Sequence, residues 1–101
     1  MKQRGRQHLV SCDAELANQL GQAIAAYAEA AYPPGGSECG QMAREALLDT
    51  AHLCANHDGG ELTLPRRQLA MLRAAVGWAG EQFDADSADA MKALVAGRRG
   101  A

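Results

Sequence analysis

The chain has 101 residues, the length of one domain with a modest core, and a formal net charge of −2. No run of about eighteen consecutive apolar residues occurs, which excludes a membrane-spanning helix. Sixteen residues are Leu, Ile, Val or Phe, whereas twenty-two are Ala. Because alanine favours helix, we expect one all-α domain over residues 1–101. Its thin core leaves a role for self-association or for a partner in stabilising the fold.

The two ends of the chain are basic. Residues 1–10 lack the long apolar segment of a signal peptide, so we expect a cytoplasmic protein with a basic N-terminal arm over 1–10 and a frayed basic tail over 97–101. Cys12, Cys39 and Cys54 are odd in number and widely spaced, which is typical of reduced thiols rather than of a disulfide framework.

Two helices are predicted in the first half of the chain. The first begins near Ser11 or Asp13, which are both good N-caps, and ends at the "YPPGG" turn. The second begins at a Ser37 cap and ends over residues 56–60, where Gly59 or Gly60 takes the left-handed conformation. Their predicted apolar stripes are Leu16, Leu20, Ile24, Tyr27 and Ala31 in the first helix, and Ala43, Leu47, Ala51 and Cys54 in the second, widened by Met42, Ala46 and Leu53.

A third helix is predicted over residues 61–83, with Thr63 as its cap and Pro65 in its first turn. The "ELTL" at its start could instead be a short extended piece, but no sheet is evident for it to join. A shorter fourth helix follows, capped by Asp86 or Ser87. We therefore expect a small antiparallel bundle of three long helices, about five turns each, plus a short C-terminal helix. The predicted core residues of this half are Leu69, Leu72, Val76, Ala79, Phe83, Met91, Leu94 and Val95.

The segment "HLCANHDGG" at residues 52–60 contains residue types used in metal and thiol chemistry. On a helix, His52 and His57 diverge by about 140°, and the Cys and His spacings of structural zinc sites are absent. Cys54 and His57 share a face, but Cys54 lies on the apolar stripe, where a free cysteine usually acts as a small hydrophobe. We predict no metal, no cofactor and no catalytic residue. An enzyme using Cys54 and His57 stays as a third hypothesis, which thiol reactivity would test.

Charge is distributed unevenly along the chain. Between residues 7 and 65 there are eight acidic residues and one basic residue, Arg44, which gives a net charge of −7. Glu38, Glu45 and Asp49 of the second helix are the candidate contacts with a basic partner. The alternative is an ordinary solvated acidic surface.

Arg66, Arg67 and Arg73 form a second candidate surface, with Arg66 and Arg73 expected on one face of the third helix. Arginines at the start of a helix suggest nucleic-acid contact, and the second and third helices could form a helix-turn-helix. However, the connection at residues 57–65 is too long for the turn of that motif, and DNA-binding domains are usually basic. Direct nucleic-acid binding is therefore the less favoured hypothesis. Its alternative is a solvated face whose arginines pair with acids of the second helix.

Trp78, the only tryptophan, either completes the core or anchors a partner. Gly77 and Gly80 lie beside it within the predicted helix. Each glycine there costs about 1 kcal/mol relative to alanine, so the pair predicts close packing of another backbone, from the same fold or from a partner.

In overall form, the acidic block, the arginine face and the bare helical framework resemble the small proteins of phages and other mobile elements, and among these the chain is similar in kind to anti-CRISPR inhibitors. The resemblance implies binding to a large nucleoprotein effector and blocking of its DNA site, and it assigns no residue. Our main hypothesis is a non-enzymatic helical protein that occludes a protein or nucleoprotein partner. The alternative is a DNA-binding accessory protein or transcriptional regulator that uses the arginine-rich start of the third helix. The predicted partner-binding residues are Glu38, Glu45, Asp49, Arg66, Arg67, Arg73 and Trp78.

Overall fold

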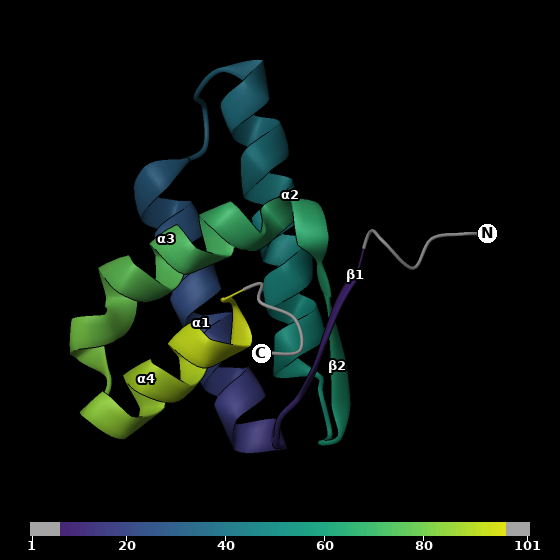
Figure 1. Ribbon diagram of the computed structural model, residues 1–101. Coiled ribbons are helices and arrows are strands. Elements are labelled where there is room, and N and C mark those ends of the chain that lie inside the picture. Colours follow the sequence, from purple (N-terminus) through teal and green to yellow (C-terminus); the bar gives the residue numbers. More distant parts are fainter. Residues whose placement is uncertain (1–6, 97–101) are drawn as a thin grey trace.

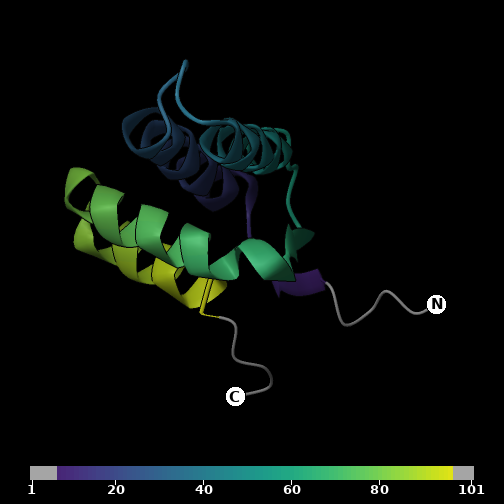
Figure 2. The ribbon, with the colours of Figure 1, turned by 90° about the horizontal axis from the view of Figure 1, so that it is seen from above.

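The computed structural model describes residues 7–96 and is mostly helical, with one small sheet (Figure 1). Helices α1 and α2 form one layer and helices α3 and α4 a second, while the two strands lie to one side (Figure 2). Helix α1 packs against α2, α3 and α4, so it is the central element of the core. In chain order the elements are β1 (Gln7–Ser11), α1 (Ala14–Ala31), α2 (Glu38–Ala55), β2 (Glu61–Pro65), the 3₁₀ turn η2 (Arg66–Gln68), α3 (Leu69–Ala79), the 3₁₀ turn η3 (Gly80–Gln82) and α4 (Ala85–Leu94).

Side-chain caps fix the start of three helices. The Asp13 carboxylate accepts the Leu16 N–H at 2.7 Å, and the Ser37 hydroxyl accepts the Gly40 N–H at 3.1 Å, as the sequence predicted. Helix α4 begins earlier than predicted. Phe83 is extended, so the chain turns into the helix at Asp84, whose carboxylate accepts the Ser87 N–H at 3.2 Å. The hydrogen bonds from Ser87 hold the pKa of Asp84 below its usual value.

The third predicted helix is shorter than expected. Residues 61–65 are the strand β2, so Thr63 is not a cap, and α3 itself covers only Leu69–Ala79. The bundle therefore has two long helices of 18 residues and two short ones of 11 and 10 residues, rather than three long helices. The alternation of exposed Glu61 with buried Leu62 and Leu64 has the period of a strand and not of a helix.

The partner of β2 is β1, which lies inside the segment predicted as a basic arm. The two strands pair antiparallel, with His8 opposite Leu64 and Val10 opposite Leu62. These four side chains face the core or its edge, while Leu9 points outward and is 54% exposed. The arm prediction is therefore wrong for residues 7–10. Its first six residues, and the predicted tail at 97–101, lie outside the described residues.

Most of the predicted core positions are buried, including Leu20 and Ile24 of α1 and Leu47 of α2. Helices α1 and α2 approach each other closely at Gly21 of α1. A β-carbon built there would lie 2.9 Å from the carbonyl oxygen of Ala51 and 3.2 Å from the Cβ of Cys54. Gly21 is therefore required for α1 and α2 to pack at this distance.

The close contact predicted at Gly77 is absent from the described fold, because a β-carbon there would meet nothing within 4 Å. At Gly80 it would meet only the Cβ of Ala88, at an ordinary 3.9 Å. Both glycines at residues 59 and 60 have positive φ angles, of 117° and 87°. They form the turn that leads from α2 into β2. Within residues 7–96, none of the helices has the length and apolar character needed to cross a bilayer.

Candidate partner-binding surface

Within residues 52–60, the side chains of Cys54 and His57 both pack against other parts of the fold. The Cys54 side chain is fully buried, and burial raises the pKa of its thiol to about 11, with a smaller contribution from Cys12. A nucleophilic thiol needs the opposite, a lowered pKa and partial exposure. The His57 Nε2 lies 3.0 Å from the Cys12 carbonyl oxygen and 3.2 Å from that of Gly60, so the ring joins the end of α2 to the strand pair. His52 is exposed.

We expect Cys54 to be unreactive in the folded protein. In a variant with Cys12→Ser and Cys39→Ser, an aromatic disulfide reagent at pH 8 should label Cys54 at least about a hundredfold more slowly than it labels exposed Cys39 in the matched Cys12→Ser, Cys54→Ala variant. Labelling of Cys54 should become fast after unfolding in guanidinium. Equal native rates would contradict the buried site and favour the enzyme hypothesis.

Metal binding by this segment finds no support in the geometry. Within residues 7–96, no three His, Cys, Asp or Glu side chains gather closely enough to hold a metal ion.

The three candidate acids of α2 share its outward face. Glu38, Glu45 and Asp49 are all exposed. At about 100° per residue, they fall within an arc of about 40°. Two large apolar side chains extend the same face, since Met42 is 71% and Leu53 is 54% exposed. The prediction that Met42 and Leu53 widen the core stripe of this helix is wrong, since both side chains are exposed. Helical spacing from Glu38 and Asp49 would have placed them on the acidic face.

We call this surface the α2 face and define it by Glu38, Met42, Glu45, Asp49 and Leu53. Within residues 7–96, the one ion pair joins Arg44 to Glu29, and none involves an acid of the α2 face. Its carboxylates are therefore free to meet a cation from outside the fold. The two apolar side chains lie within reach of the same partner.

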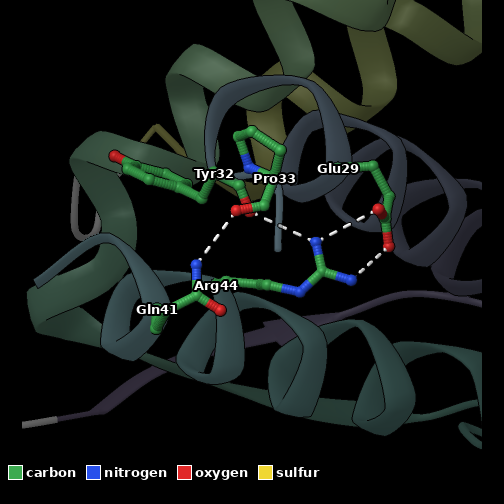
Figure 3. A network of polar contacts seen from close by, with 5 residues as sticks. All are labelled: Glu29, Tyr32, Pro33, Gln41 and Arg44. Carbon is green, nitrogen blue, oxygen red and sulfur yellow. Dashed lines mark hydrogen bonds and ion pairs between the residues drawn. The ribbon is translucent and has the colours of Figure 1, made fainter. Parts of the chain in front are cut away.

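The only basic residue of the acidic block is used inside the fold. Arg44 Nη2 donates to one Glu29 oxygen at 2.7 Å, and its Nη1 donates to the other at 3.1 Å and to the Tyr32 carbonyl at 3.2 Å (Figure 3). The neighbouring Gln41 amide donates to the Pro33 carbonyl at 2.9 Å. The Arg44 guanidinium holds the pKa of Glu29 below its usual value. This network ties the ends of α1 and α2 together and engages Arg44, the one basic residue between positions 7 and 65, away from the acids of the α2 face.

Charge also differs between the two helical layers. Residues 13–58, which contain α1 and α2, carry seven acids and one base. Residues 66–96, which contain α3 and α4, carry four of each. The negative charge of the described chain is therefore concentrated on the layer that presents the α2 face.

The predicted arginine face is divided among different elements. Arg66 lies in η2 and donates to the Gln7 carbonyl of β1 at 3.2 Å. Arg73 donates to the carbonyls of Val95 and Ala96, at 3.2 Å and 3.3 Å, and so caps the C-terminal end of α4. These arginines were alternatively expected to pair with acids of the second helix. Within residues 7–96, no such ion pair is found. Arg67 is exposed.

Trp78 is partly packed against the fold and partly exposed. Its ring packs edge-on against Tyr27 of α1, with 6.0 Å between ring centroids, yet the residue remains 46% exposed. Tyr27 in turn meets Tyr32 at 6.4 Å, and the Tyr32 hydroxyl donates to the Met71 sulfur at 3.7 Å. Trp78 therefore closes an aromatic row between α1 and α3 and lies on a different layer from the α2 face.

Comparisons with models of protein families, with curated proteins and with solved structures found no match to this chain. The assignment of function therefore depends on the surfaces themselves.

Proposed function

We propose that this protein docks its α2 face on a basic surface of a protein or nucleoprotein partner and thereby blocks nucleic acid from that surface. The observation that carries the proposal is the presence, on one helix face, of three exposed carboxylates that have no ion-pair partner within residues 7–96, together with two exposed apolar side chains, Met42 and Leu53. The three free thiols are compatible with a cytoplasmic protein, where cysteines stay reduced.

The two kinds of side chain have different roles in such an interface. Exposed carboxylates attract a basic surface and speed association, but each contributes little affinity and is screened by salt. Burial of apolar area contributes about 25 cal/mol per Å², so Met42 and Leu53 supply the attraction that persists at physiological salt. An acidic surface without apolar anchors would fit a merely solvated face better.

The preferred partner is a protein whose basic surface holds nucleic acid. Such a groove presents Lys and Arg side chains that neutralise phosphates, and the α2 face offers carboxylates to the same cations. The resemblance in form to anti-CRISPR inhibitors makes a CRISPR effector complex the first partner to test, with its DNA-binding groove as the occluded surface.

Charge reversal of the α2 face tests the proposal. We expect the variant Glu38→Lys, Glu45→Lys, Asp49→Lys to lose its partner while keeping its fold, because all three side chains are exposed. The tagged protein would be expressed in cells carrying an active CRISPR system, recovered after nuclease treatment and analysed for a stoichiometric partner. The same cells would report inhibition as restored phage plaquing.

The matched control changes the net charge equally at exposed acids outside α2, with Asp58→Lys, Glu81→Lys and Asp89→Lys. It should retain both the partner and the inhibition. A charge-reversed α2 face that still binds the partner would refute the proposal. A second pair of variants, Met42→Ala and Leu53→Ala, should weaken binding with little change in its salt dependence.

The alternative is direct DNA binding through the second helical layer, which holds four of the five Lys and Arg residues of the described chain. A gel shift with duplex DNA separates the two functions. DNA binding would fall steeply with salt and be lost with Arg66→Gln, Arg67→Gln, whereas occlusion predicts no shift near physiological salt. We rank this function second because Arg66 and Arg73 already bind carbonyls of the fold.

A further inference from the structure

A pocket between α3 and the end of α4 lies apart from the α2 face. Its volume is about 310 Å³, and it is lined by Arg73, Gly77, Lys92, Val95 and Ala96. Two of these five residues are cations, and none is an acid. The volume is at the lower end of the range for pockets that bind small molecules.

Contacts within the fold fix one of the two cations. Arg73 Nη1 donates to the Val95 and Ala96 carbonyls, and this satisfies the partial negative charge at the end of α4. The same contacts orient the guanidinium at the pocket. Within residues 7–96, its remaining N–H groups and the Lys92 ammonium have no hydrogen-bond or ion-pair partner. Both residues line the pocket, so an anion bound there lies beside both of them.

Gly77 leaves the pocket open. It lies within helix α3, where glycine is unfavourable, and no fold contact requires it, since a β-carbon there would meet nothing within 4 Å. Gly77 itself lines the pocket, so we expect a larger side chain at this position to occupy part of it. Gly77 and Val95 give the pocket an apolar part beside its two cations.

We propose that this pocket binds a small organic anion, with a carboxylate or phosphate group held by Arg73 and Lys92 and a short apolar group held against Gly77 and Val95. Arginine and lysine both recognise these oxyanions through charge-assisted hydrogen bonds. The proposal is independent of the α2 face, so either can fail without the other.

The test is an NMR titration of the full-length ¹⁵N-labelled protein with butyrate, butyl phosphate or n-butylammonium as separate probes. We expect both anions to produce saturable shifts of the Gly77, Lys92 and Ala96 amide signals, and n-butylammonium to produce none. The anion that binds more tightly identifies the preferred head group. Absence of localised shifts with both anions, or equal shifts with n-butylammonium, would overturn the proposal.

Variants distinguish the pocket from general attraction of anions. Lys92→Gln should weaken anion binding about fivefold, and Gly77→Leu should abolish the shifts by filling the pocket. Arg67→Gln removes the same charge outside the pocket, and Ala74→Leu adds the same kind of side chain at an exposed site on α3, so both should bind like the parent protein. Unchanged binding by Lys92→Gln and Gly77→Leu would refute the site. Arg73 is left intact because it also caps α4.

Discussion

Replacing Gly21 by alanine is expected to lower the free energy of unfolding by about 2 kcal/mol, which corresponds to roughly 8–16 °C in Tm for a domain of this size. The added β-carbon would lie 2.9 Å from the Ala51 carbonyl oxygen, a distance at which something must move. That oxygen belongs to the backbone of α2 and cannot rotate away. Relief requires separation of α1 from α2, which would weaken the largest helix–helix contact of the core.

The sign of this prediction is informative because alanine is the better helix former. In an open helix, Gly→Ala stabilises by up to about 1 kcal/mol. Gly77→Ala is the matched control, since its β-carbon would meet nothing within 4 Å, and we expect it to raise Tm. Thermal unfolding followed by circular dichroism measures both. If Gly21→Ala raised Tm as Gly77→Ala is expected to, the close packing at Gly21 would be contradicted.

Local signals in the sequence predicted the helical part of this fold well. Asp13 and Ser37 cap their helices as expected, because a cap needs only one side chain and the next turn of backbone. The buried positions Leu72 and Val76 followed from helical period in the same way.

The strand pair could not be predicted in this way. The partners β1 and β2 are each five residues long, and their paired residues lie 50 to 58 positions apart in the chain. Each alone gives too short an alternation to distinguish it from a loop or a helix start. The inward position of His8 also interrupts the apolar alternation expected of a strand, because histidine is not counted as an apolar residue.

The candidate surfaces show the same difference between what local sequence signals predict and what depends on tertiary packing. Exposure of Glu38, Glu45 and Asp49 followed from their charge, but the engagement of Arg73 by the end of α4 depends on tertiary packing between elements distant in sequence. Similarly, an apolar residue such as Met42 was assigned to the core on its chemistry, although α2 packs mainly against α1 and exposes Met42 to solvent.

His8 is expected to be essential for the stability of the fold although it lies in the segment that was predicted as a basic arm. Its side chain is buried, and its Nε2 lies 2.9 Å from the Leu94 carbonyl oxygen near the end of α4. This contact joins the first described strand to the last helix. His8→Ala would leave a cavity and a buried carbonyl without its partner, and we expect a loss of about 2–3 kcal/mol in the free energy of unfolding.

Leu9→Ala is the control for this prediction, because the neighbouring side chain is larger in apolar area but points away from the core and is 54% exposed. We expect it to change stability by less than about 0.5 kcal/mol. Urea unfolding at pH 7 would measure both variants. Hydropathy alone would predict the reverse, with a larger loss of stability for Leu9→Ala than for His8→Ala. If His8→Ala were as stable as Leu9→Ala, then β1 would not be fastened to α4, and the pairing of β1 with β2 would have to hold the strand alone.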